Sequence, residues 1–176
     1  MKGAETMKTK TITLYKFSEL SEEAQDKAVN KLADINIDDD WWDYTYSDAE
    51  NIGLEITEFD TYHGTIKGKL TSTLKESIDK VMSDHGNECE TYKTAQSFCL
   101  ELQKLEQEEE RKEEDDRDSY EFEQAVEDLE KEYTHAILED YLIILRDEYE
   151  YQTSKKAIIE TIEANDYDFT EDGEID

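Results

Sequence analysis

Hydrophobic side chains recur at steps of three and four residues from residue 92 to residue 144. This spacing is that of one face of an α-helix, so the region is predicted to form a pair of amphipathic helices. The opposite face is left to acidic side chains. The apolar positions are Tyr92, Ala95, Phe98, Cys99, Leu102 and Leu105, then Phe122, Val126, Leu129, Tyr133, Ala136, Ile137, Tyr141 and Ile144.

The break between the two helices is predicted at residues 113–118. Neither Gly nor Pro occurs from residue 87 to residue 172, so backbone geometry alone does not interrupt a helix there. Asp118 and Glu121 have the spacing of a capping box for the second helix. One continuous helix is the alternative, but an antiparallel hairpin lets each apolar stripe cover the other.

Residues 9–70 are predicted to form the element order β-α-α-β-β. Residues 10–16 alternate like a half-buried strand, and Ser18 or Ser21 begins a helix. Residues 38–40 cap a second helix that places Trp42, Tyr46 and Ala49 on one side. Residues 54–70 are typical of a β-hairpin that turns at residues 63–64.

The remaining elements are two helices and an edge strand. One helix begins after Thr71 or Ser72 and ends at Gly86, and the last begins after Thr153 or Ser154 and ends at Asn165. Residues 167–169 add a short strand. The predicted fold class is α+β, with a small antiparallel sheet of three or four strands packed with helices, plus a long acidic helical hairpin. We expect an N-terminal region 1–86, the hairpin 87–152, and a C-terminal part 153–176 that packs back on the N-terminal region.

Charge sets the class of partner. The 176 residues carry a net charge of −30, of which −10 lies in residues 106–131, yet 11 Tyr, 5 Phe and 2 Trp favour a folded chain over a disordered acidic one. Such a field repels nucleic acid and anionic membranes and attracts basic proteins. Two cysteines make no disulfide framework, and the longest apolar run, residues 141–145, is too short to span a membrane. These features indicate a cytoplasmic protein.

Two acidic clusters are the predicted partner-binding residues. Without a binding role, the clusters are a solvated face that keeps the protein soluble. With one, they imitate the phosphate backbone of DNA. Trp41, next to the first cluster, either packs half-exposed or anchors in a partner's pocket. The first cluster is Asp38, Asp39, Asp40 and Asp43, and the second is Glu108, Glu109, Glu110, Glu113, Glu114, Asp115, Asp116 and Asp118.

Metal and catalytic sites find little support. Glu132 and His135 have the spacing of di-iron bundle ligands, but neither other histidine follows a Glu by three residues. Residues 168–176 match the start of a calcium loop and end before its bidentate glutamate, so a turn is favoured. The sequence shows no Gly-rich phosphate loop and no arrangement for nucleophilic catalysis. We expect no enzyme, no cofactor and no metal.

Two long segments carry a resemblance. Residues 14–36 and 38–60 read LYKFSELSEEAQDKAVNKLADIN and DDDWWDYTYSDAENIGLEITEFD, and residues 161–175 read TIEANDYDFTEDGEI. They resemble small acidic proteins encoded by bacteriophages and other mobile elements of gut Firmicutes, some of which act as anti-CRISPR inhibitors of type II-A Cas9. The resemblance covers the first 70 and last 15 residues well and the acidic hairpin poorly. It implies an anti-defence role.

The sequence therefore predicts a non-enzymatic inhibitor that binds a nucleic-acid-handling defence nuclease, with Cas9 the best candidate, through an acidic DNA-mimicking surface. The runner-up is a helical assembly module that dimerises through residues 133–145, with acidity serving solubility. A weak cation-binding protein is the third alternative.

Overall fold

The structure, a computed structural model, describes residues 11–37, 40–113 and 119–175. The chain divides into two compact units, one formed by residues 1–39 and 150–176 and the other by residues 40–149. The predicted N-terminal region 1–86 is therefore split between the two units, because residues 40–86 belong to the same unit as most of the helical hairpin. Among the described residues, no helix combines the length and the apolar character that crossing a bilayer requires.

The first unit is built from both ends of the chain. Its elements are β1 (Tyr15–Lys16), the short 3₁₀ helix η1 (Phe17–Glu19), α1 (Glu22–Lys31), α6 (Lys155–Ala164) and β4 (Asp168–Phe169). β1 pairs with β4 in antiparallel fashion, Tyr15 opposite Phe169. The wholly buried Phe169 ring packs edge-on against Phe17, with centroids 6.1 Å apart.

Local sequence explains where the helices of this unit begin. Ser21 accepts a hydrogen bond from the Ala24 amide, and Ser154 accepts one from the Ala157 amide. Each serine thus satisfies an amide at its helix start that has no partner within the helix. At Gly173, φ is +79°, and a Cβ there would lie 2.2 Å from the Ala24 carbonyl oxygen. The C-terminal turn can therefore lie against α1 only with glycine at this position.

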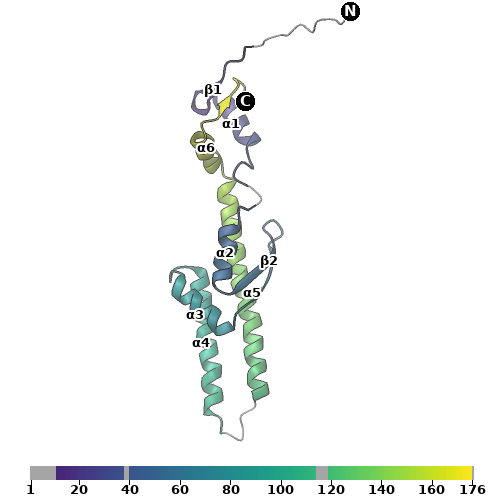
Figure 1. Cartoon of the computed structure of the whole chain (residues 1–176), viewed down its shortest axis with the longest axis vertical. Coiled ribbons are helices and arrows are strands. Elements are labelled where there is room, and N and C mark those ends of the chain that lie inside the picture. The colour runs from purple at the N-terminus through teal and green to yellow at the C-terminus, as the bar shows by residue number, and fades with distance from the viewer. Residues whose placement is uncertain (1–10, 38–39, 114–118, 176) are drawn as a thin grey trace, which may run out of the picture. The chain divides into compact units, whose positions relative to one another are not determined.

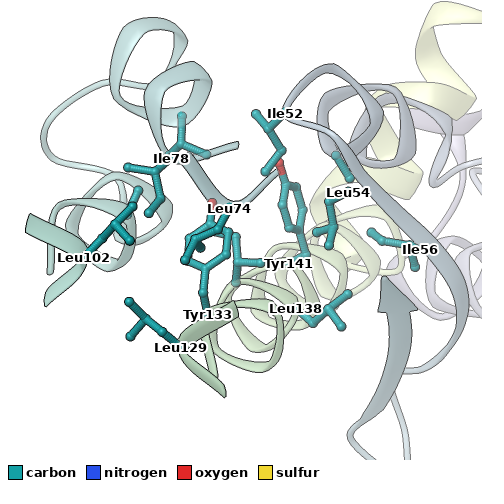
Figure 2. Packing of buried hydrophobic residues seen from close by; sticks show 14 residues of the cluster. Ile52, Leu54, Ile56, Leu74, Ile78, Leu102, Leu129, Tyr133, Leu138 and Tyr141 are labelled. Atoms are coloured by element: carbon teal, nitrogen blue, oxygen red, sulfur yellow. The ribbon is translucent and has the colours of Figure 1, made fainter. Parts of the chain in front are cut away.

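The second unit holds the larger core. Its elements are α2 (Asp43–Asn51), β2 (Leu54–Asp60), β3 (Thr65–Leu70), α3 (Leu74–Asp84), α4 (Glu90–Arg111) and α5 (Ser119–Gln152), whose last three residues belong to the first unit. Figure 2 shows how these elements converge on α5. The labelled side chains are Ile52, Leu54, Ile56, Leu74, Ile78, Leu102, Leu129, Tyr133, Leu138 and Tyr141, all buried.

The β2–β3 hairpin packs directly on α5. Its strands pair from Leu54 opposite Leu70 to Asp60 opposite Thr65, with a register shift between Ile56 and Glu58. A Cβ at Gly68 would lie 2.5 Å from the Glu55 carbonyl oxygen and 2.8 Å from Leu138 Cδ2. The glycine therefore lets the strand approach the helix closely.

The predicted helix pair is present. α4 and α5 lie side by side (Figure 1), and their contacts run antiparallel, from Thr94 with Asp140 to Phe98 with Tyr133. The proposed capping residue Asp118 lies outside the described residues.

The α+β class is confirmed. Two details differ. Within the described residues the four strands form two separate two-stranded sheets, β1–β4 and β2–β3, where one sheet of three or four was expected. α3 is capped by Thr73, not by Thr71 or Ser72, because Thr73 lies three residues before Glu76 and completes a reciprocal capping box with it.

Candidate functional site: an acidic helix pair

Partly buried contacts set the register of α4 against α5. The Thr94 hydroxyl donates a hydrogen bond of 2.7 Å to Asp140 on α5. One turn of α4 further on, the Phe98 ring meets the Tyr133 ring edge-on at 5.5 Å. Tyr133 in turn shares a hydrogen bond of 3.0 Å with Ser77 of α3. The helix pair is thus anchored by α3, while α5 also packs against α2 and the β2–β3 hairpin.

Burial changes the ionisation of groups inside this pair. Removal from water raises the pKa of Tyr133 to about 12, so the phenol is neutral at physiological pH. Burial also raises the pKa of Asp140, and the negative charges of Glu90 and Glu139 add to that effect, while the Thr94 hydrogen bond opposes it. The charged form of Asp140 is therefore disfavoured by its partly buried position and its acidic neighbours.

The net negative charge of the helix pair per unit length is similar to that of one strand of DNA. Residues 90–111 and the facing residues 119–140 together contain fourteen carboxylates and four lysine or arginine side chains, a net charge of −10. Each of these 22-residue segments is about 33 Å long at 1.5 Å per residue. The pair therefore carries about one net negative charge per 3.3 Å of axis. A single strand of B-DNA carries about one per 3.4 Å.

Carboxylates on both helices gather into stripes beside the buried face. The carboxylates of the α5 stripe are seven, four and seven residues apart. Because an α-helix has 3.6 residues per turn, they lie within about 20° of one line along the helix, over a length of about 27 Å. On α4 the steps are eleven and seven. The α5 stripe is Glu121, Asp128, Glu132 and Glu139, and the α4 stripe is Glu90, Glu101 and Glu108, all on exposed positions.

The structure describes part of the second predicted cluster. Glu108, Glu110 and Glu113 are exposed at the C-terminal end of α4 and just beyond it. Glu109 is different, because its side chain is only 18% exposed and forms an ion pair of 2.8 Å with Lys112. The predicted residues Glu114, Asp115, Asp116 and Asp118, and Asp38 and Asp39 of the first cluster, lie outside the described residues.

Trp41 is packed within its own unit. Its half-buried ring lies 5.7 Å from Trp42, 5.8 Å from Phe59 and 5.7 Å from Tyr149, measured between ring centroids. These contacts fit the packing alternative better than the anchor. Asp40 and Asp43 lie beside it on exposed positions.

The described residues of the two predicted clusters lie at different places along α5. Trp41, next to Asp40, contacts Tyr149, whereas Glu109 and Glu110 line a surface hollow together with Phe122. Phe122 and Tyr149 are 27 residues apart on one helix, which is about 40 Å. The sequence alone does not show where each cluster lies along α5, because that position depends on tertiary contacts. The helix pair, which joins Glu108–Glu110 to the α5 stripe, is therefore the stronger candidate site.

The alternative cation sites are occupied by other contacts. His135 Nε2 lies 3.7 Å from Glu139 Oε1 on the helix surface. In the C-terminal turn, Lys27 lies 3.1 Å from Asp172 and 2.9 Å from Glu174, and Lys31 also pairs with Glu174. The two described carboxylates at the expected ligand positions of a calcium loop, Asp168 and Asp172, are thus each paired with a lysine, Asp168 with Lys16 and Asp172 with Lys27. The part of the chain that the structure describes holds no group of three or more metal-ligating side chains.

Comparison with protein-family models, with curated proteins and with solved structures found no significant match to this chain.

Sequence reasoning missed one feature of the second unit. His85, considered only as a metal ligand, is the C-terminal cap residue of α3 and lines a pocket of about 480 Å³. The pocket also takes residues from α2, α4 and α5. Residues as far apart in sequence as Asp48 and Asp147 meet there, and no local pattern predicts such a meeting.

Proposed function

We propose that this protein is a non-enzymatic inhibitor that binds the basic, nucleic-acid-binding groove of a host defence nuclease. The observation that carries the proposal is the linear charge density of the α4–α5 pair, which equals that of one DNA strand on a folded support. A groove that holds a phosphate backbone with lysine and arginine can hold this pair in its place.

The rigidity of the support separates this proposal from simple solubility. Neighbouring carboxylates repel one another and lower the stability of a helix. Here they are held in place by a core that includes Leu102, Leu129 and Tyr133, all buried. A fixed array loses little conformational entropy when a partner binds, whereas a flexible acidic tail must be ordered at that moment.

The class of nuclease comes from the sequence resemblance, which favours type II-A Cas9 in the host bacterial cytosol. Complementary charge would speed association and fix orientation, while the aromatic and aliphatic contacts nearby would decide which basic protein is bound. The protein itself would not bind nucleic acid, because both carry high negative charge.

The experiment is a DNA-cleavage assay with purified Cas9–guide complex and increasing amounts of this protein, at low and at high salt. The test variant reverses three exposed charges of the pair, Glu108→Lys, Glu123→Lys and Glu132→Lys. The control variant makes the same total change in the first unit, Asp34→Lys, Glu163→Lys and Glu171→Lys, at exposed positions.

The proposal expects inhibition that weakens with salt and is lost in the test variant but kept in the control. Equal weakening in both variants would mean that net charge alone matters, and the site would be wrong. Absence of inhibition by the folded protein would exclude Cas9. Pull-down of nucleases from a bacterial host lysate on both variants would then test the wider class.

The assembly alternative has less surface than the sequence suggested. Within residues 133–145 the side chains of Tyr133, Ile137, Leu138, Tyr141, Leu142 and Leu145 are buried inside the chain. Ile143 and Ile144 stay 49% and 40% exposed. Two isoleucines form a small patch for a stable dimer, whose interface usually buries about 800 Å² on each partner.

A further inference from the structure

A pocket beside the helix pair contains a buried histidine nitrogen that lacks a hydrogen-bond partner. The His85 side chain is 9% exposed, and its Nδ1 shares a hydrogen bond of 2.8 Å with Thr91 Oγ1. The other ring nitrogen, Nε2, is shielded from water and makes no hydrogen bond among the described residues. A polar atom in this condition costs stability unless something else satisfies it.

The nearest acid to that nitrogen is Asp48 of α2. Asp48 Oδ1 lies 3.5 Å from His85 Nε2, which is too long for a good hydrogen bond. Asp48 Oδ2 is held by the Tyr141 hydroxyl, which donates a bond of 2.7 Å. In the tautomer that keeps the ring proton on Nδ1, the Asp48 carboxylate and His85 Nε2 are two neighbouring acceptor positions, with Asp48 bonded to Tyr141 of α5 and His85 to Thr91 of α4.

The rest of the pocket is acidic on one side and apolar on the other. Its lining residues include five carboxylates and no lysine or arginine. Asp84, Asp140 and Asp147 add negative charge around Asp48, and the exposed Ile143 and Ile144 of α5 supply the apolar wall. A ligand that fits this lining is a cation with a hydrocarbon stem.

We propose that the pocket binds the guanidinium group of an arginine side chain from the protein partner. The guanidinium would donate to Asp48 and to His85 Nε2, and its stem would lie along Ile143 and Ile144. A guanidinium fits better than a lysine ammonium for two reasons. It offers a planar fork of donors, and it is less strongly hydrated, so it enters a partly apolar pocket at lower cost.

Access to Nε2 requires one movement. Because that nitrogen is covered, the incoming group first meets Asp48, whose side chain is 49% exposed, and reaches Nε2 when that carboxylate turns. His85 must then keep its proton on Nδ1, so that Nε2 accepts. This tautomer makes Nδ1 the donor to Thr91.

The inference rests on the proposed function only for the source of the arginine. The pocket can therefore be tested without the nuclease, by titrating the whole protein with Nα-acetyl-arginine amide and recording histidine nitrogen resonances. Nα-acetyl-lysine amide is the comparison probe. The variants are Asp48→Asn, which keeps an acceptor for Tyr141, and the exposed Asp147→Asn. The matched control is Glu123→Gln, an equal charge change on α5 outside the pocket.

The expected result is a free protein whose His85 Nε2 is unprotonated at pH 8, and a saturable shift of that resonance on adding the arginine probe. Asp48→Asn should weaken binding about tenfold, since it removes a charge-assisted bond. Asp147→Asn should weaken it severalfold, and Glu123→Gln should leave it within twofold.

Three results would overturn the inference. One is a protonated Nε2 that does not respond to the arginine probe. Another is binding reduced equally by Glu123→Gln and Asp48→Asn, which would mean unspecific attraction to the acidic surface. The third is equal binding of the lysine and arginine probes. Inhibition of Cas9 without arginine binding would contradict the pocket alone, and arginine binding without inhibition would contradict the proposed nuclease alone.

Discussion

Ser77 and Tyr133, 56 residues apart in sequence, share a hydrogen bond of 3.0 Å inside the core of the second unit, where both side chains are wholly buried. This bond ties α3 to the centre of α5. Together with the other buried side chains of α5, it sets the rotation of that helix about its axis, and hence the direction of the acidic stripe of Glu121, Asp128, Glu132 and Glu139.

A double-mutant cycle measures this bond. Ser77→Ala leaves the buried Tyr133 hydroxyl without its partner and should lower the free energy of unfolding by about 1–3 kcal/mol. Tyr133→Phe should cost less, because a serine hydroxyl can turn to a backbone carbonyl of its own helix. The double variant should be more stable than the sum of the two effects predicts, by about 1 kcal/mol. Urea unfolding gives all four values, and strict additivity would show that the two hydroxyls are not coupled.

Asp140 gives a pH-dependent prediction. Folding raises its pKa, so the folded chain holds the proton more tightly than the unfolded chain does. Its favourable contribution is therefore present below the unfolded pKa, about 3.9, and is lost as pH rises through the folded pKa. Asp140→Asn, which keeps an acceptor for Thr94, should stabilise the protein at pH 7 and have a smaller effect near pH 4.

The control for Asp140 is Glu132→Gln, which removes one charge from an exposed position of the same helix. It reports the general benefit of lowering a net charge of −30. The desolvation account fails if Asp140→Asn stabilises no more than this control at pH 7, or if its effect grows as pH falls.

The capping box of α3 gives a local prediction. The Thr73 hydroxyl accepts from the Glu76 amide at 3.3 Å, and the Glu76 carboxylate accepts from the Thr73 amide at 3.0 Å. Thr73→Ala should destabilise the protein by about 1 kcal/mol, whereas Ser72→Ala should have little effect. Thermal unfolding compares the two, and a larger loss for Ser72→Ala would contradict the assigned cap.

Net charge predicts how stability depends on salt. Repulsion among the carboxylates is long-ranged at low ionic strength, where the Debye length is about 30 Å at 0.01 M, and is screened at 0.15 M, where it is about 8 Å. The urea midpoint should therefore rise when sodium chloride is added. Replacing Glu108, Glu123 and Glu132 by Gln should reduce that rise, and a rise of the same size would place the repulsion elsewhere in the chain.

The sequence predicted the elements better than their partners. The helix pair was readable because its stripe, from Tyr92 to Ile144, keeps a helical period for some fifty residues. The cap of α3 was placed too early because three hydroxyl residues, Thr71 to Thr73, follow one another. A single sheet was expected, but the strands form two sheets, because Tyr15 pairs with Phe169. These residues are more than 150 positions apart, and no local sequence pattern predicts a pairing over such a distance.

Some features of the candidate site were also predictable from the sequence, and others were not. The acidic character of α4 and α5 is visible in the sequence, but the separation of Asp43 from Glu108 along α5 follows only from the contact of Trp41 with Tyr149. The pocket at His85 was not foreseen. A lone histidine after a helix is ordinary, and its lack of a partner at Nε2 appears only when α2, α4 and α5 are folded around it.

The central claim is that the α4–α5 pair competes with a nucleic-acid backbone for a basic groove. Its most direct test is the concentration of this protein that halves DNA cleavage by the Cas9–guide complex, measured at 50 mM and at 300 mM salt. The account predicts at least a tenfold rise in that concentration at the higher salt, because several charge pairs are screened together. Inhibition of equal strength at both salt concentrations would contradict it.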